Sequence, residues 1–576
     1  TVTPMMSSRL FKNKKTKGRI FSGFNKYMDG LEEKLQESYG KLLSWSLKHR
    51  WVVALVVVAL LGLSVSFIIT GRIGTEFMPY TDEGQYTVNL KLDPGTAIGI
   101  TDSKTKQVEE YVSKIPETDY IRSQVGFSSD GNGDTNQASV LVKMVEKSKR
   151  KRSQKEVVEE VRHWGKALTG VDLSVTEPSM GDGGTGGGYK PININVKGTD
   201  TNVLNEISQQ VVDIAKKTSG VIEVGSSFEQ GKPSYDIKVD KVSAAMYGIS
   251  SYDISNTVRS GIEGVKSGTY SVGRKDYDVR VKLSGNSIKD INDLNNLYIT
   301  GSTGNQIQLG QLAKVSLADS PVVIRRLDKQ RVLTISANVQ QGHTLGEVTG
   351  NIQKNVDKLK LPDGYSISLS GEQQNMNDTF TSLIQVLVLS LLLLYIILGV
   401  LYESFLTPLV RLLALPVGII GALSMLAITG KSLNMMSMIG IIMLDGLAAK
   451  NGTILIDFTN GLMEKGMELR DALLVAGKTR LKPILMTSFA MIVGMLPTAL
   501  SFGDGSEFKS SMALVIIGGM FTSTILSPLL IPVAYTYLDD FRLALKRFFK
   551  GLTTGSASVK HNEEKSWVFK EGENEL

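Results

Sequence analysis

The sequence predicts a membrane protein of the α+β class, in which six transmembrane helices carry one large polar insert of strands and helices. Six apolar runs reach the length that a helix needs to cross a bilayer, about 20 residues. A polar region, residues 72–375, separates the first run from the other five and is far too long for a linker. A mean hydropathy of +0.01 in a chain that is 21% charged fits this alternation. The expected spans are 51–69, 379–401, 407–429, 435–458, 483–501 and 511–538.

The composition of the 576-residue chain excludes several kinds of site. Cysteine is absent, so neither a disulfide framework nor a thiolate metal site is available. The four histidines are far apart and form no ligand pair. The net charge is +7, which in a membrane protein indicates basic cytoplasmic loops rather than nucleic-acid binding. We therefore expect no nucleic-acid partner, no bound cofactor and no resident metal.

Lysine and arginine indicate the orientation of the spans, because basic loops stay on the cytoplasmic side. Residues 1–50, the expected loop 459–482 and the segment after the last span are rich in both, whereas the two short loops on the other side hold only Lys431 and Lys509. We expect a multi-pass protein of the cytoplasmic membrane with both termini cytoplasmic and the insert outside. Residues 551–576 are expected to form a disordered cytoplasmic tail.

Residues 1–50 form a basic segment before the first span, and apolar residues recur in it at steps of three and four. This pattern predicts an amphipathic helix on the cytoplasmic membrane surface; a soluble helix packed on a partner is the alternative. The sequence begins at Thr1 with TVTPMMSSRLFKNKK, which resembles the end of a membrane helix running into a basic segment. We therefore expect the chain to be a piece of a longer polypeptide.

The first part of the insert, residues 72–185, predicts the order β-α-β-β-α-β. Alternating apolar residues indicate the strands, and SQKE at 153–156 is a capping box that opens the second helix. This order is typical of a ferredoxin-like unit. The expected strands are 86–92, 120–127, 138–145 and 171–175, and the expected helices are 97–115 and 153–168.

The same order restarts after the glycine-rich stretch GDGGTGGG at 181–188. It is interrupted by a small mixed subdomain, residues 235–315, so the second ferredoxin-like unit consists of residues 186–234 and 316–375. The expected strands are 192–196, 221–224, 332–339 and 365–371, with helices at 202–218 and 344–359.

Three short motifs favour a structural interpretation over a chemical one. GDGGTGGG lacks the Gly-Lys-Ser/Thr of a phosphate loop, so we interpret it as a hinge. DGNGDTN at 130–136 has neither the glycine at position six nor the glutamate at position twelve of a calcium loop, which favours a polar loop. The methionines of the fourth span suggest soft-metal transport or ordinary gap-filling in helix packing; they are Met435, Met436, Met438 and Met443.

The fourth span, which contains GLAAKNGTILIDF, carries two costly intramembrane charges, Asp445 and Lys450. Five residues separate them, about 140° around a helix, so they do not face each other. The other five spans contain no internal carboxylate. Either Lys450 snorkels toward Asp457, roughly 10 Å along the helix, or its counter-charges belong to helices outside this chain.

Several long blocks, in order along nearly the whole chain, resemble the C-terminal half of a resistance–nodulation–division multidrug exporter of the hydrophobe/amphiphile type. They are IGTEFMPYTDEGQYTVNLKLDPGT, DIKVDKVSAAMYGISSYDISNTVRSGIEG, IRRLDKQRVLTISANV, YESFLTPLVRLLALPVGIIGAL, GLAAKNGTILIDF and TRLKPILMTSFAMIVGMLP. The high lysine and modest aromatic content suggests a Gram-positive homologue of the surfactin-resistance type.

The resemblance implies export driven by the proton motive force, with protons as the coupling ion. The family's other half carries an Asp-Asp pair at the place that Lys450 and Asn451 occupy here. Proton binding to that pair alters its contact with the lysine and with a threonine, matched here by Thr487. Arg480 matches an arginine near the cytoplasmic proton entrance. Asp445 departs from the family pattern; it could pair with Lys450 across a distortion, tune the relay or face a water path.

The resemblance also implies that the two ferredoxin-like units form one wall of a substrate cleft, that residues 235–315 help to hold a trimer together, and that the other half supplies the opposite wall. A periplasmic adaptor-like protein and membrane lipid are further implied partners. The segment 126–136 matches the family's cleft switch loop. The expected cleft residues are Phe127, Ser128, Gly131, Gly133 and Val140.

Three other functions stay open. A protein-export accessory subunit also has six spans and an outward ferredoxin-like domain, but a smaller insert. A soft-metal exporter of the same family would need paired methionines or acids along the cleft. A regulatory half-protein would bind a transporter without transporting. Neither the exported compound nor the need for an outer-membrane channel can be deduced from these residues.

Overall fold

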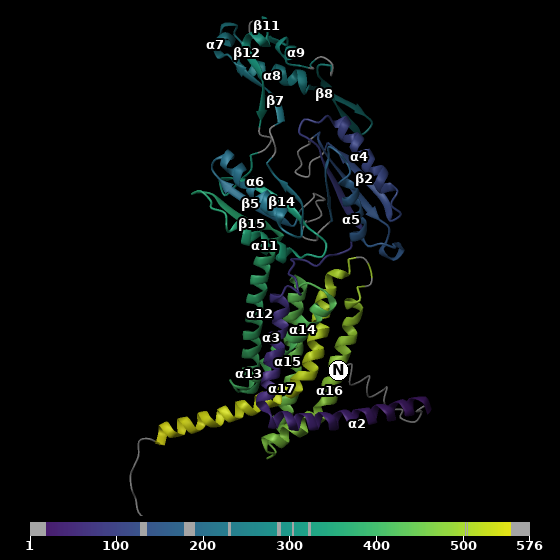
Figure 1. Ribbon diagram of the computed structural model, residues 1–576, viewed down its shortest axis with the longest axis vertical. Coiled ribbons are helices and arrows are strands. Elements are labelled where there is room, and N and C mark those ends of the chain that lie inside the picture. Colours follow the sequence, from purple (N-terminus) through teal and green to yellow (C-terminus); the bar gives the residue numbers. More distant parts are fainter. Residues whose placement is uncertain are drawn as a thin grey trace, which may run out of the picture. The chain divides into compact units, whose positions relative to one another are not determined.

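The computed structural model divides into two compact units, Thr1–Thr81 with Asn375–Leu576, and Asp82–Gln374. The first contains the long apolar helices and the second contains the insert (Figure 1). The structure describes residues 19–126, 135–177, 190–228, 232–284, 288, 290–301, 304–320, 324–501, 503 and 505–554.

Among the described residues of the first unit, six helices are long and apolar enough to cross a membrane. Each coincides with one expected span, and the third is divided into a short and a longer helix. They are α3 (Arg50–Ile69), α12 (Glu372–Tyr402), α13 (Thr407–Leu412) with α14 (Ala414–Thr429), α15 (Met435–Met463), α16 (Leu469–Ala499) and α17 (Glu507–Thr554).

The expected loop 459–482 is wrong in its extent. Helix α15 continues to Met463 and α16 already begins at Leu469, so the basic residues of this segment lie mostly on helix. The apolar run marks where a helix can enter hydrocarbon, whereas the helix itself extends as far as its hydrogen bonds and packing support it. Leu473 and Ala476, both before the apolar run, are buried.

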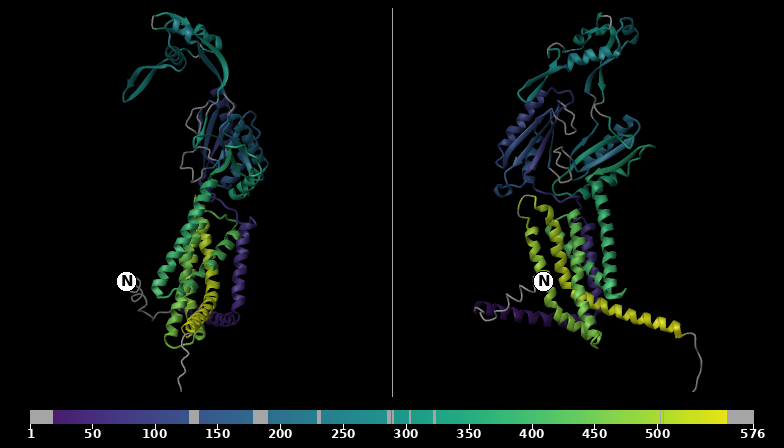
Figure 2. Two further views of the ribbon diagram at one scale, coloured as in Figure 1. Left: turned by 90° about the vertical axis from the view of Figure 1, so that its left-hand side faces the viewer. Right: turned by 180° about the vertical axis from the view of Figure 1, so that it is seen from behind.

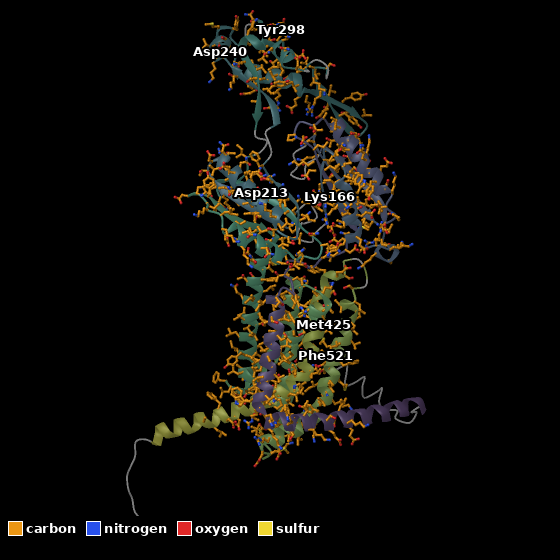
Figure 3. The ribbon with its side chains drawn as sticks, in the orientation of Figure 1. Lys166, Asp213, Asp240, Tyr298, Met425 and Phe521 are labelled. Atoms are coloured by element: carbon orange, nitrogen blue, oxygen red, sulfur yellow. The ribbon has the colours of Figure 1, made fainter. Side chains whose placement is uncertain are left out.

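Three of the spanning helices form the interior of the first unit. In their most apolar windows α14, α15 and α17 are 50%, 56% and 61% buried, whereas α3 and α12 are 11% and 6% buried. Helices α14 and α17 approach closely where Gly421 lies against Gly518; a Cβ on Gly421 would be 2.1 Å from the Gly518 carbonyl oxygen. Small residues permit such backbone contact between membrane helices. Met425, beside Gly518, is labelled in Figure 3.

The amphipathic helix α2 (Arg19–Lys48) runs across the spanning helices (Figures 1 and 2). Near its C-terminal end Leu43 and Leu47 are buried against Leu473 of α16 and Val533 of α17. The Tyr39 hydroxyl donates to the backbone carbonyl of α17 at Pro528, 2.9 Å away. The apolar stripe of this part of α2 therefore packs on its own chain.

The first half of the insert is one four-stranded antiparallel sheet with two helices. Its strand order is β2-β3-β1-β4, and Val88 of β1 lies opposite Val140 of β3 and Val175 of β4. The Ser153–Glu156 capping box is confirmed at the start of α5. The elements are β1 (Gln85–Lys91), α4 (Ile98–Ser113), β2 (Thr118–Val125), β3 (Gln137–Met144), a single 3-10 turn η1 (Lys147–Lys149), α5 (Gln154–Gly165) and β4 (Asp172–Thr176).

The second half repeats this topology in two pieces of chain. Strand β5 lies between β14 and β15, and β6 pairs with the other edge of β14. The elements are β5 (Ile192–Gly198), α6 (Thr201–Lys217), β6 (Val221–Ser226), β13 (Arg326–Leu327), β14 (Gln330–Val339), α11 (Leu345–Val356) and β15 (Ser366–Gly371).

The interrupting segment has its own small core, built around Ile254, Ile299 and Leu309. It is connected to the second half by the ribbon of β7 and β12. A hairpin of β8 and β9 is exposed along its whole length. The elements are β7 (Lys232–Val239), α7 (Lys241–Met246, capped by Asp240, labelled in Figure 3), α8 (Ser251–Ile262), β8 (Val265–Val272), β9 (Lys275–Val281), α9 (Ile291–Asn295), β10 (Tyr298–Thr300), β11 (Gln306–Gln308), α10 (Leu309–Leu312) and β12 (Ala313–Ser320).

Candidate functional site

Helix α15 places the two charges of the fourth span on different sides. It begins at a reciprocal capping box in which the Asn434 side chain accepts from the Ser437 amide at 2.9 Å. On the exposed side, Met443, Gly446, Lys450 and Asp457 recur at steps of three, four and seven. We call these four residues the open stripe; they share one face because seven residues complete nearly two turns.

Asp445 lies away from the open stripe and is only 4% exposed. The Ser390 hydroxyl of α12 lies 3.5 Å from Oδ2 of its carboxylate and also donates to the Leu387 carbonyl at 3.0 Å. The suggested pairing of Asp445 with Lys450 across a helix distortion is therefore wrong; the carboxylate faces α12. Asp445 thus forms a polar contact between α15 and α12 that does not involve Lys450.

Lys450 itself is exposed, and it has no ion pair or hydrogen bond with any other residue that the structure describes. The suggested snorkelling contact with Asp457 is not formed in the structure; that carboxylate pairs with Arg411 and accepts the hydroxyl of Tyr402. The neighbouring Asn451 is buried, at 2% exposure, and its Nδ2 has no hydrogen-bond acceptor among the described residues. The open stripe thus presents an ammonium group that has no partner among the described residues.

The two predicted relay residues of α16, Thr487 and Arg480, contact groups other than Lys450. Thr487 is exposed, and its hydroxyl donates to the Ile484 carbonyl of its own helix at 3.2 Å. The Arg480 guanidinium stacks 4.3 Å over the ring of Phe458 on α15, and its buried Nε has no hydrogen-bond acceptor in the described part of the chain. Arg480 therefore joins α16 to α15 near the end of α15.

The structure shows a charge cluster that sequence reasoning missed. Arg411 of α13 is wholly buried, and one guanidinium nitrogen lies 2.7 Å from the Asp457 carboxylate. The guanidinium carbon stacks 3.5 Å over the ring of Tyr402, whose hydroxyl donates to the same carboxylate at 2.9 Å. The three residues come from α12, α13 and α15, and Asp457 follows the other two by 46 and 55 residues, so no spacing rule connects it to them. The available signal was a charged residue in each of two neighbouring spans.

Of the five expected cleft residues, only Val140 belongs to the described part of the chain. Phe127, Ser128, Gly131 and Gly133 lie outside the described residues. Val140 is fully buried in the core of the first sheet, where its side chain packs against other apolar side chains. The expected cleft role of Val140 therefore does not match its position.

The two other motifs also fall mainly outside the described residues: most of DGNGDTN and all of GDGGTGGG. Within the described ranges, no group of three or more His, Cys, Asp or Glu side chains is arranged to hold a metal ion. Of the methionines in the fourth span, Met438 is buried at 7% exposure and Met443 is 45% exposed on the open stripe.

Comparison with known proteins places these features in a family. A model of the AcrB/AcrD/AcrF family matches residues 1–539. The swarming motility protein SwrC of Bacillus subtilis is 27% identical over 545 residues, which cover 94% of this chain and 50% of that protein. The multidrug resistance protein MdtC of Erwinia tasmaniensis is 28% identical over 551 residues, covering 94% of this chain and 52% of MdtC.

A crystal structure of a heavy metal efflux pump superposes with a TM-score of 0.77 at 25% identity, covering 89% of this chain and 53% of the pump. The chain therefore spans about half the length of the curated relatives it matches. The family match extends over both units, from the first described helix to the last spanning helix. The chain belongs to the AcrB/AcrD/AcrF family, whose members are resistance–nodulation–division transporters.

Proposed function

We propose that this chain is one half of a transporter that uses the proton motive force to export amphiphilic or hydrophobic compounds. One observation carries the proposal: Lys450 stands on the open stripe of α15 with no counter-ion among the described helices, while Asp445 faces α12 instead. An intramembrane ammonium ion is costly unless a carboxylate or water compensates it. We assign that compensation to an acidic pair on helices outside this chain.

In this proposal protons are the coupling ion and no cofactor takes part. Protonation of the acidic pair releases its contact with Lys450, and this change in contact is the local event that a conformational cycle can amplify. Asn451 and Thr487 would supply neutral hydrogen-bonding groups to the rearranged pair, and Arg480 would lie near the cytoplasmic entrance. Asp445 would tune the relay from the side of α12.

We further propose that the insert is extracytoplasmic and that its two α/β halves, as ferredoxin-like porter subdomains, supply one wall of the substrate cleft. The basic residues of 1–50 and of the end of α17 support cytoplasmic termini. The exposed β8–β9 hairpin supports assembly into a trimer through the small subdomain, because several of its apolar side chains are largely exposed in the described chain. These include Tyr270, Val272, Tyr277 and Val279, all more than 40% exposed. An adaptor protein would be a further partner.

A second candidate function is export of a soft metal ion by the same proton-driven cycle. It is favoured by the fold similarity to a heavy metal efflux pump and by the four methionines at the start of α15. Amphiphile export is favoured by the similarity to MdtC, which is a multidrug resistance protein.

One experiment separates the two candidates. The complete transporter is reconstituted in liposomes with an imposed pH gradient, and uptake of a fluorescent cationic amphiphile is compared with uptake of Cu⁺ or Ag⁺. Gradient-dependent movement of the amphiphile alone supports the first function, and movement of the metal ion alone supports the second. If neither moves in a gradient-dependent way, proton-driven export is wrong.

A further inference from the structure

Three side chains surround the buried guanidinium group of Arg411, and we call the four residues together the Arg411 cluster: Arg411, Tyr402, Thr453 and Asp457. Arg411 has no exposed surface, which is rare for a guanidinium and requires compensation. It receives that compensation from the ion pair with Asp457 at 2.7 Å, from the ring of Tyr402 at 3.5 Å and from a weak contact with the Thr453 hydroxyl at 3.5 Å. The contacts connect α12 and α13 to α15.

Two members of the cluster, Arg411 and Tyr402, bind Asp457, which is the carboxylate on the same face of α15 as Lys450. Asp457 follows Lys450 by seven residues, about two turns and roughly 10 Å along the axis, and both belong to the open stripe. Oδ1 of Asp457 binds Arg411, and Oδ2 accepts the hydroxyl of Tyr402. Asp445, the other carboxylate of the described helix, is buried on a different side.

We propose that Arg411 is a positioning residue for the proton relay: by neutralising Asp457 it prevents this carboxylate from satisfying Lys450 within the same helix. This inference rests on the proposed function of Lys450. A lysine with a flexible four-carbon stem moves its ammonium toward the nearest available negative charge or water. With Asp457 occupied, the ammonium stays available to the acidic pair across the interface.

The charged and titratable groups around this stretch of α15 are few in the described helices. Arg411 and Tyr402 contact Asp457 directly, and Arg480 of α16 stacks on the next residue, Phe458. From α17, the Tyr535 hydroxyl donates to Asn460 at 2.7 Å. Removal of the Arg411 charge therefore leaves Asp457 with only the Tyr402 hydroxyl as a direct partner.

A purely structural role for Arg411 makes a different prediction. The cluster encloses the turn between α12 and α13, in which Glu403 has a positive φ of 50°, so loss of Arg411 could simply loosen this turn. In that case removal of Asp457 as well would not restore function. If Arg411 acts by neutralising Asp457, removal of both charges restores the availability of Lys450.

The test compares Arg411→Met with the double variant Arg411→Met/Asp457→Asn in the complete transporter, reconstituted with a pH gradient and a fluorescent amphiphile. An uncompensated charge about 10 Å from Lys450 is expected to move the pH profile of transport upward by about one unit. We expect the single variant to lower the rate near neutral pH about ten-fold, and the double variant to return to within about two-fold of the wild type.

A conservative variant keeps the test decisive if Arg411→Met does not fold. Tyr402→Phe removes one hydrogen bond to Asp457 and retains the ring under the guanidinium; a smaller shift of the pH profile in the same direction is expected. Arg411→Lys retains the charge and is expected to keep the wild-type pH profile. A double variant no better than Arg411→Met, or an unchanged profile in both Arg411→Met and Tyr402→Phe, would overturn the inference.

The experiment distinguishes a failure of the Arg411 inference from a failure of the proposed proton-driven export. If proton-driven export is wrong, the wild type itself shows no gradient-dependent transport in the same liposomes. If the wild type transports and Lys450→Ala does not, the relay assignment stands and the Arg411 variants test the inference alone.

Discussion

At the residue scale, the chemistry of the first unit depends on how α15 distributes three charged side chains. Lys450 is exposed without a partner in the described chain, Asp457 is neutralised by Arg411, and Asp445 is buried beside Ser390. One helix thus carries an exposed cation and two carboxylates that contact other side chains. This arrangement makes the contributions of the three residues separately testable.

Replacement of Lys450 by alanine is expected to abolish gradient-driven export while the amount of transporter in the membrane stays near normal. Lys450→Arg is expected to fail as well, because arginine keeps its charge but does not readily deprotonate and has a different donor geometry. Cellular resistance to an exported amphiphile and transport in liposomes measure the effect. Lys465→Ala, at an exposed position just after α15, is the matched control and should behave as the wild type. Full resistance with Lys450→Ala would contradict the relay assignment.

Asp445→Asn is expected to give a milder defect, with export reduced less than ten-fold and an altered pH optimum. Asparagine preserves the shape and the contact with Ser390, but it removes a titratable group from between α12 and α15. The measurement is the transport rate across pH 5.5–8.5. A pH profile that matches the wild type would leave Asp445 with a packing role only.

At the element scale, the Glu223 side chain of β6 joins the two α/β halves of the insert. The Glu223 carboxylate accepts from Arg162 of α5 at 3.1 Å and from Asn338 of β14 at 2.6 Å. Its backbone carbonyl accepts from Lys190 at 2.6 Å, and burial lowers the pKa of that lysine. Glu223 holds this position with a φ of 53°, which is unusual for a residue other than glycine.

Glu223→Gln is expected to destabilise the insert by about 1–3 kcal/mol, since hydrogen bonds to charged groups contribute on this order when partly buried. Glu159 also pairs with Arg162, but at 3.4 Å and with a side chain that is 49% exposed. Glu159→Gln is therefore the matched control, with an expected effect below about 0.5 kcal/mol. Thermal unfolding of the purified transporter, followed by limited proteolysis of the insert, measures both. Equal effects of the two substitutions would show that Glu223 does not join the halves.

A contact between the residues just before α5 and just before β2 gives the insert an acid-sensitive component. Arg152 binds Glu117 through two nitrogens, at 3.1 and 2.6 Å, and these hydrogen bonds lower the pKa of Glu117. Because the folded-state pKa lies below the unfolded one, the stabilisation is present above the ordinary glutamate pKa and is lost as the pH falls through the lowered value. Glu117→Gln is expected to reduce the acid-induced loss of stability below about pH 4.5. The hydrogen bond from Lys114 also lowers the pKa of Glu110, but both side chains of that pair are exposed and solvent screens them. Glu110→Gln is therefore the comparison variant and should change that slope less than Glu117→Gln.

At the scale of the whole molecule, both units contain surfaces that the described chain leaves uncovered. Helix α12 is 6% buried in its most apolar window, and Lys450 lies on the exposed side of α15. The chain covers about half of its curated relatives. These facts together support the proposal that transport needs a second, similar set of helices.

We predict that the 576-residue chain, reconstituted alone, does not carry out proton-coupled export. Lys450 would have no acidic pair to contact, and the insert would supply only one wall of a cleft. Co-expression with a segment that carries the acidic pair should restore transport of a fluorescent amphiphile in liposomes with a pH gradient. Gradient-dependent transport by the chain alone would mean that the relay runs through Asp445 and Lys450, between neighbouring copies.

The sequence by itself determined the features that depend on local patterns. Hydropathy located the six apolar helices, and period-two alternation located the strands of both α/β halves to within a few residues. SQKE correctly predicted the cap of α5, and helix geometry showed that Asp445 and Lys450 do not face each other. These inferences succeed because hydrogen bonding within a helix or strand repeats over a few residues.

Only the tertiary structure decided which charges meet. Arg411 and Asp457 are 46 residues apart and Tyr402 and Asp457 are 55 apart, so their contact depends on how α12, α13 and α15 pack. The early start of α16, the burial of Val140 and the turn of Asp445 toward Ser390 have the same origin. A side chain's partner is set by the neighbouring elements that remove it from water, and no local period in the sequence records that choice.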